Sequence, residues 1–311
     1  MTTRPFKQVD VFTDQPYFGN PLAVVLDGSG LDDAAMQRFA QWTNLSETTF
    51  VLPATEASAD YRVRIFTPGG ELPFAGHPTL GTCHAWLEAG GVPKRQDVIV
   101  QQCQTGLVPI RQEGVGRAFA APALKRSAPS PVVLAQVAAA LGLKAQHIIA
   151  AQLLDNGPVW LGLLLDSADT VLHIEPDHLT LKKYGLKVGV AGAHAAQAAP
   201  LLIARSSREA RAFAASDHRA PVDSADFADF EVRAFAAPIG IEEDPVTGSL
   251  NASLAQWLTA EGHAPETYVV AQGTCLGRAG RVHLSRETTG GTSVVWVGGE
   301  SVTCISGTVA L

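Results

Sequence analysis

The sequence of 311 residues has few charged side chains and no run of basic ones. Charged residues make up 17% of the chain and the net charge is −7, whereas soluble domains average about 25% charged residues. A protein that binds nucleic acid presents a basic patch or stripe, so we expect no nucleic-acid partner. The hydrophobic share of 46% also excludes a disordered chain or a coiled coil, because both need a far more polar composition.

Motifs that bind metals or cofactors are absent as well. The four cysteines form no Cys-x-x-Cys pair, and the nine histidines form no His-Glu-x-x-His motif. His173 and His178 stand close in the sequence, but Pro176 breaks any helix that would align them. No glycine-rich phosphate loop is present. The sequence therefore predicts no metal, no organic cofactor, and reduced, mostly buried thiols at Cys83, Cys103, Cys275 and Cys304.

No hydrophobic run suits a membrane-spanning helix. The least charged stretch, 188–204, contains His194 and Pro200 and falls short of the roughly 18 apolar residues that a span needs. The first ten residues lack the apolar core of a secretory signal. We therefore expect a cytoplasmic protein without a membrane partner.

What the chain does contain is an internal repeat. Its length suits two domains of about 150 residues, and residues 123–131 are a plausible linker between them. Counting back fifteen residues from Trp86 and Trp257 gives Glu71 and Glu242, and counting back nine gives His77 and Gly248. We interpret this as two copies of one βα module, occupying residues 1–125 and 126–311, with the last strand free to pack back on the first half. Three short patterns recur: Gly19-Asn20-Pro21 with Asn156-Gly157-Pro158, Arg64-Ile65-Phe66 with Arg233-Ala234-Phe235, and Trp86-Leu87 with Trp257-Leu258.

Each module has a turn that leads into a helix, at residues 74–79 and 243–249. Pro78 suits the first helical position, Gly76 allows close backbone approach, and Ser249 suits an N-cap. A helix start offers unpaired N–H groups and a partial positive charge, which together favour a carboxylate or a phosphate. Two facing helix starts would hold a small acid at two points. Ordinary helix capping explains either turn taken alone.

Glu47 opens an apolar strand in the segment Asn-Leu-Ser-Glu-Thr-Thr-Phe-Val. A carboxyl group in poorly solvated surroundings has a raised pKa, which makes it a usable proton carrier near neutral pH. The other interpretation is a glutamate at a strand end that points outward. In the same way, His77 could serve only as an N-cap, and Asp244 could only cap the turn at Pro245.

These segments resemble the signature blocks of the PhzF family of phenazine-biosynthesis isomerases. The resemblance implies an α+β fold of the diaminopimelate epimerase type: two pseudo-symmetric halves, each with a mostly antiparallel sheet wrapped around a central helix, and an active site between them. The blocks span most of the chain in the expected order. They are Gly19-Asn-Pro-Leu-Ala-Val-Val25, Asn44-Leu-Ser-Glu-Thr-Thr-Phe50, Phe66-Thr-Pro-Gly-Gly-Glu-Leu-Pro-Phe-Ala-Gly-His-Pro-Thr-Leu-Gly81 and Glu243-Asp-Pro-Val-Thr-Gly-Ser249.

The same resemblance implies an isomerase that moves a proton on a small carboxylic acid without a metal or an organic cofactor. In the phenazine enzyme the acid is trans-2,3-dihydro-3-hydroxyanthranilate, and the family is commonly homodimeric. The resemblance makes Glu47 the catalytic acid and base, with help from His77 and Asp244. It assigns the substrate carboxylate to backbone and hydroxyl donors of Gly76, Gly248 and Ser249.

Two other functions remain open from the sequence. A racemase or epimerase of this fold uses a cysteine at each helix start, but here Ala75 and Val246-Thr247 occupy those turns. A metabolite-binding or interaction protein without activity would need none of these side chains. The chain is also longer than the phenazine enzyme, with apparent extra length at 191–229 and near 287–293, and the shared blocks do not define the substrate.

Overall fold

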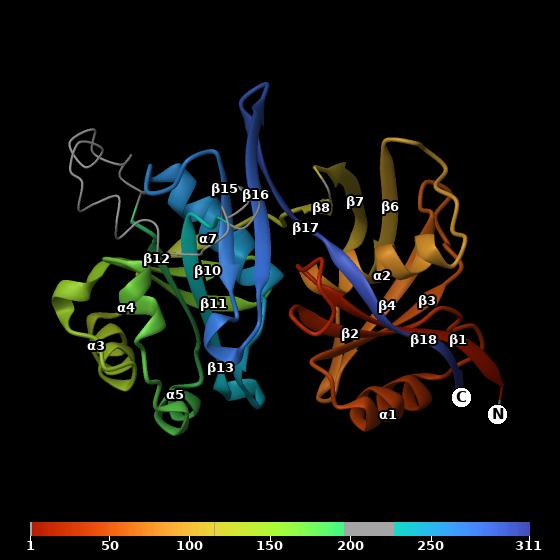
Figure 1. Ribbon diagram of the computed structural model, residues 1–311, viewed down its shortest axis with the longest axis horizontal. Helices are drawn as coiled ribbons and strands as arrows, with labels where there is room; N and C mark the ends of the chain where they lie inside the picture. The colour runs from red at the N-terminus through yellow and green to blue at the C-terminus, as the bar shows by residue number, and fades with distance from the viewer. Residues whose placement is uncertain (1, 115, 196–226) are drawn as a thin grey trace, which may run out of the picture.

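The computed structural model describes residues 2–114, 116–195 and 227–311. It has two halves that lie side by side, and in each half the strands curve around one helix (Figure 1). Most of the alanine-rich segment 191–229, which the sequence marks as extra length, lies outside the described residues. None of the described helices is long and apolar enough to span a membrane.

The first half surrounds helix α2. Its other helix, α1, covers the outer side of β3 and β4. The elements of this half are β1 (Thr3–Val11), β2 (Asn20–Val25), α1 (Asp33–Thr43), β3 (Glu47–Leu52), β4 (Tyr61–Thr67), β5 (Gly70–Leu72), α2 (Gly76–Glu88), β6 (Val98–Cys103), β7 (Gly106–Glu113) and β8 (Gly116–Ala120).

The second half surrounds helix α7, and the described helices α3, α4 and α5 pack on its outer side (Figure 1). Its elements are β9 (Lys125–Ser127), α3 (Pro131–Ala140), β10 (Ile148–Asp155), β11 (Val159–Leu165), α4 (Ala168–Leu172), α5 (His178–Tyr184), β12 (Lys187–Ala193), β13 (Phe230–Ala236), β14 (Ile241–Asp244), α7 (Gly248–Ala260), β15 (Thr267–Gln272), β16 (Gly280–Thr289), β17 (Thr292–Gly299) and β18 (Ser301–Ala310).

The order of strand pairs is the same in both halves. In the first, β2 pairs parallel with β3 and β4 pairs parallel with β6. In the second, β11 pairs parallel with β12 and β13 pairs parallel with β15. The pairs β3–β4, β4–β5, β6–β7 and β7–β8 are antiparallel, as are β12–β13, β13–β14, β15–β16 and β16–β17. The repeat expected from the sequence is therefore a repeat of topology.

An ion pair that recurs in the two halves shows the repeat of topology in the side chains as well. Arg64 donates two hydrogen bonds to Glu71, at 2.7 and 2.6 Å. Arg233 donates two to Glu243, at 2.9 and 2.8 Å. The sequence count matched Glu71 with Glu242, which is wrong by one residue. Side chains alternate along a strand, so Glu242 on β14 points outward while Glu243 faces Arg233.

The two halves share their last strands. β17 pairs with β8, and β18 leaves the second half to pair antiparallel with β1 along its whole length. The backbone groups of Thr2 and Leu311 complete this ladder with N–H···O distances of 2.6 and 3.0 Å. The strands thus form one continuous sheet that runs through both halves.

The central helices begin earlier than the sequence indicates. α2 begins at Gly76 with Ala75 as its N-cap, so Pro78 is its third residue and not its first. α7 begins at Gly248 with Thr247 as its N-cap, so Ser249 is its second residue and not its cap. Neither N-cap side chain bonds to the helix backbone. Strand pairing and close packing, not side-chain caps, therefore fix both helix starts.

Candidate active site

The starts of α2 and α7 touch each other where the two halves meet. A Cβ atom on Gly248 would lie 3.0 Å from Gly76 Cα and 3.2 Å from His77 N, and one on Gly76 would lie 2.7 Å from the Phe119 ring. Only glycine permits this approach at either position. The two helix starts are in direct contact. An anion that accepts hydrogen bonds from N–H groups of both helices would therefore have to bind beside this contact.

Glu47 and His77 lie together beside the contact. Glu47 is the first residue of β3 and its side chain is 14% exposed, while His77 is the second residue of α2. Glu47 Oε2 lies 3.3 Å from His77 Nε2. Neither atom makes a hydrogen bond to any described residue. The outward orientation considered for Glu47 is therefore wrong: the carboxyl group faces inward.

Burial shifts the proton affinities of both groups. It raises the pKa of Glu47 to about 7, although a hydrogen bond from Ser46 and the charge of Lys187 each lower this pKa. It lowers the pKa of His77 to about 4. At neutral pH, then, His77 is uncharged and Glu47 divides between its acid and base forms. A group whose pKa equals the working pH can both accept and donate a proton.

Asp244 enters the site from the second half, at the end of β14. Its carboxylate accepts hydrogen bonds from Thr247 Oγ1 at 2.6 Å and from Asn20 Nδ2 at 2.9 Å. Burial raises the pKa of Asp244 to about 6, and the nearby Glu47 carboxyl adds to the rise. The bond to Thr247 makes Asp244 a turn cap as well as a site residue, so these two interpretations are compatible.

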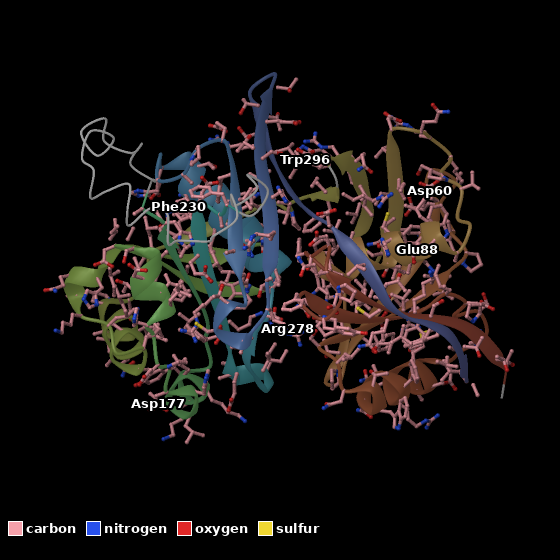
Figure 2. All side chains as sticks on the ribbon, viewed as in Figure 1. Asp60, Glu88, Asp177, Phe230, Arg278 and Trp296 are labelled. Carbon is pink, nitrogen blue, oxygen red and sulfur yellow. The ribbon has the colours of Figure 1, made fainter. Side chains whose placement is uncertain are left out.

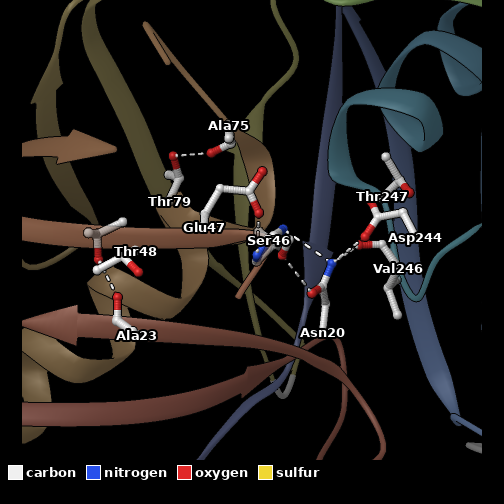
Figure 3. A network of polar contacts seen from close by, with 12 residues as sticks. Asn20, Ala23, Ser46, Glu47, Thr48, Ala75, Thr79, Asp244, Val246 and Thr247 are labelled. Carbon is white, nitrogen blue, oxygen red and sulfur yellow. Dashed lines mark hydrogen bonds and ion pairs between the residues drawn. The ribbon is translucent and has the colours of Figure 1, made fainter. Parts of the chain in front are cut away.

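Asn20, at the start of β2, is a central residue that the sequence analysis treated only as part of a turn. It is fully buried, and its Nδ2 donates to Asp244 Oδ1 and Val246 O, each at 2.9 Å. Its amide also lies 3.4 Å from His77 Nδ1 and accepts a 3.4 Å hydrogen bond from Ser46 Oγ. Figure 3 shows Asn20 between the Glu47 side and the Asp244 side of the network. One amide group therefore connects His77 with Asp244.

The turn that precedes Asn20 is itself held by the second half. Arg278, which lies between the halves in Figure 2, donates to Tyr17 O at 2.8 Å and to Gly19 O at 3.3 Å. Ala279 N donates to Phe18 O at 2.9 Å. These backbone contacts fix the turn and, with it, the position of the Asn20 amide.

Ser249, the second residue of α7, has a hydroxyl group that accepts one hydrogen bond. Its Oγ accepts the Trp160 indole N–H at 3.3 Å, and its carbonyl accepts from Asn156 Nδ2 at 2.8 Å. A hydroxyl that accepts one hydrogen bond keeps its own hydrogen to donate. Ser249 thus offers an O–H group next to the N–H groups of the helix start.

The site contains groups that can transfer a proton. No set of three His, Cys, Asp or Glu side chains in the described part of the chain could hold a metal ion. Cys83 lies inside α2, and burial raises the pKa of its thiol to about 12, so it stays protonated. Cys275 is exposed, contrary to the expectation of mostly buried thiols. The two-cysteine arrangement of a racemase does not form here.

The chain is similar to known proteins along most of its length. The model of the phenazine biosynthesis-like protein family, PhzC-PhzF, matches residues 9–307. The chain belongs to this family. It is 34% identical to antisense-enhancing sequence 1 of Schizosaccharomyces pombe, over 99% of both chains. It is also 31% identical to the trans-2,3-dihydro-3-hydroxyanthranilate isomerase of Pseudomonas aeruginosa, over 91% of this chain and 90% of that one.

Solved structures show the same fold. The PhzF-family phenazine biosynthesis protein of Enterococcus faecalis superposes with a TM-score of 0.73 and 26% identity, covering 100% of both chains. A probable proline racemase from Agrobacterium radiobacter superposes with a TM-score of 0.61 at 13% identity, covering 99% of this chain and 93% of that one. The fold is thus the α+β, epimerase-like fold expected from the resemblance. Several PhzF relatives are named isomerases, which identifies this chain as an isomerase.

Proposed function

We propose that this PhzF-family isomerase moves a proton within a small carboxylic acid and uses Glu47 as the proton carrier. One observation supports the role of Glu47 most directly. Its buried carboxyl has a pKa of about 7 and lies 3.3 Å from the uncharged His77 ring. General acid–base catalysis is most effective when the pKa of the carrier is close to the working pH.

The reaction would run in two proton transfers. The substrate carboxylate binds beside the starts of α2 and α7, where the N–H groups and the Ser249 hydroxyl donate to it. The Glu47 carboxylate takes a proton from a carbon next to an electron-withdrawing group, and the electron pair of the broken C–H bond shifts along the conjugated system. Protonated Glu47 then returns the same proton to a different carbon, which regenerates the carboxylate.

The neighbours of Glu47 would hold the charges during this transfer. His77, uncharged at neutral pH, presents a ring nitrogen that can donate to an oxygen on which negative charge develops. Asp244 and Asn20 fix the other side of that ring through the Asn20 amide. Each start of a helix also favours negative charge by about 0.3–1 kcal/mol, and by more where it is buried.

The name of the Pseudomonas aeruginosa relative supplies the first compound to test, trans-2,3-dihydro-3-hydroxyanthranilate. Its conversion can be followed by NMR in H₂O and in D₂O. We expect Glu47→Gln to lower the rate at least 100-fold, as is typical for loss of a general base, while the affinity for the acid stays unchanged. Glu242→Gln is the matched control, because Glu242 lies exposed on β14 in the second half.

Retention of more than about a tenth of the rate by Glu47→Gln would show that Glu47 is not the base. Binding of the acid without turnover by the unaltered protein would favour a metabolite-binding function. Solvent deuterium in the product would show how much the carried proton exchanges before it returns.

We also propose, on the basis of the family resemblance alone, that the protein is a homodimer in the cytoplasm. Analytical ultracentrifugation tests the first statement and cell fractionation the second. A monomer at micromolar concentration would contradict the dimer.

A further inference from the structure

Lys187 is a charged side chain near the site that the proposed reaction does not use. It is the first residue of β12, and in the parallel pair with β11 its register partner is Trp160. The Lys187 ammonium lies 4.9 Å from the centre of the Trp160 ring. The indole N–H of the same side chain donates to Ser249 Oγ. Trp160 therefore connects the ammonium group to the residue beside the α7 start.

The ammonium acts on the acidic residues of the site without pairing with them. The charges of Asp244 and Glu47 both stabilise the protonated form of Lys187, although burial outweighs them and lowers its pKa. No carboxylate among the described residues lies within 4.0 Å of Lys187 Nζ, and no described acceptor takes a hydrogen bond from it. An ammonium group has three N–H donors. Its contact with the Trp160 ring uses the positive charge but satisfies none of them as a conventional hydrogen bond.

A half-buried cation without an acceptor is unfavourable for folding, because burial removes part of its hydration. Such a group gains most from a ligand that carries the missing negative charge. The helix starts and the Ser249 hydroxyl already suit one carboxylate. Lys187 lies on the Trp160 side of the same serine, within the electrostatic reach of Glu47, so a ligand held at the helix starts can extend towards it.

We propose that Lys187 binds a second anionic group of the substrate, so that this isomerase selects small acids with two carboxylates. This inference rests on the proposed function, since it places the first carboxylate at the helix starts. An acid with one carboxylate leaves Lys187 unpaired. An acid with two carboxylates forms an ion pair with Lys187, and this ion pair offsets the repulsion between the dianion and Asp244.

Titration calorimetry with matched unsaturated acids tests the proposal without requiring turnover. The diacids are fumarate, trans-glutaconate and trans,trans-muconate, and their methyl-ended counterparts are crotonate, trans-2-pentenoate and sorbate. Each pair differs by one carboxylate at the far end, and the series varies the distance between the two ends. We expect at least one diacid to bind about tenfold more tightly than its counterpart, which corresponds to about 1.4 kcal/mol of binding free energy.

Lys187→Met keeps the length of the side chain and its packing on Trp160 but removes the charge. It should abolish the preference for the diacid and leave the affinity for the methyl-ended acid unchanged. Lys187→Arg should keep the preference. Lys182→Met is the matched control, because Lys182 is an exposed lysine on the neighbouring helix α5.

The outcomes separate this proposal from the function on which it rests. If the methyl-ended acids bind and no diacid is preferred, or if Lys187→Met weakens both kinds of acid equally, the role of Lys187 is refuted while the anchoring at the helix starts stands. If no acid of the series binds, that anchoring is wrong and the inference about Lys187 fails with it.

Discussion

Asn20 connects the two halves at the site, and its replacement by alanine tests the arrangement most directly. Asn20→Ala removes the hydrogen bonds from Nδ2 to Asp244 Oδ1 and to Val246 O, both 2.9 Å long. A hydrogen bond to a charged acceptor contributes about 1.5–3 kcal/mol, and one to a neutral carbonyl about 1 kcal/mol. Near neutral pH the free energy of unfolding should therefore fall by about 3 kcal/mol.

The loss should depend on pH because Asp244 titrates. Burial raises its pKa from 3.8 to about 6 in the folded protein, so folding favours the protonated form. Below about pH 6 Asp244 is protonated in the unaltered protein and in the variant. In the unaltered protein the hydrogen bond from Asn20 to Asp244 then joins two neutral groups. Between about pH 8 and about pH 5 the difference in unfolding free energy should thus shrink by about 1–2 kcal/mol.

Urea denaturation followed by circular dichroism measures this difference at each pH. Asn156→Ala is the matched control, because Asn156 occupies the equivalent turn of the second half and donates one hydrogen bond of 2.8 Å to a neutral carbonyl, Ser249 O. We expect the control to lose about 1 kcal/mol at every pH. A loss for Asn20→Ala that equals the control, or that does not change with pH, would refute the reasoning.

Three further predictions concern the reaction and the helix contact. Because Glu47 must be a carboxylate to accept a proton and its pKa is about 7, kcat/KM should rise with pH and level off above this value; a profile that is flat from about pH 5 to about pH 9 would contradict this. Gly248→Ala places a Cβ 3.0 Å from Gly76 Cα, so it should lower the free energy of unfolding by about 1–3 kcal/mol and also lower turnover. Gly307→Ala is the control and should change neither quantity, because nothing lies within 4 Å of the new atom. Dialysis against a chelator should leave activity intact, and restoration of lost activity by one specific metal would overturn the proton-carrier mechanism.

Much of the fold could be predicted from the sequence because the repeat lies in short local patterns. Turns, strand ends and the two tryptophans are local features, and they recur in both modules. The count from the tryptophans is nevertheless displaced by one residue, since Trp86 lies ten residues after the start of α2 and Trp257 nine after the start of α7. Close packing of Gly76 on Gly248 decides where the helices begin, and a count along the chain does not contain that contact.

The residues of the site also fall into two groups, those that local sequence predicts and those that it does not. Glu47, His77 and Asp244 could be singled out because their types and neighbours suggest chemistry. Asn20 and Lys187 could not, because their significance lies in contacts between distant parts of the chain. Asn20 and Asp244 are 224 residues apart, and Lys187 reaches the site through the register of two parallel strands. The repeated Asn20 and Asn156 turns were the available signal for the first, and nothing local pointed to the second.

The pairing of β18 with β1 has a consequence for the order in which the protein is made and folded. β1 comprises residues 3–11, and its partner along that whole edge comprises residues 301–310. During translation the first half is therefore synthesised long before its sheet can be completed. Until then β1 presents an open edge, which is where strands from other chains can add. Pairing over so long a sequence separation is intrinsically slow. The edge of β1 thus stays open to strands of other chains until residues 301–310 have been made.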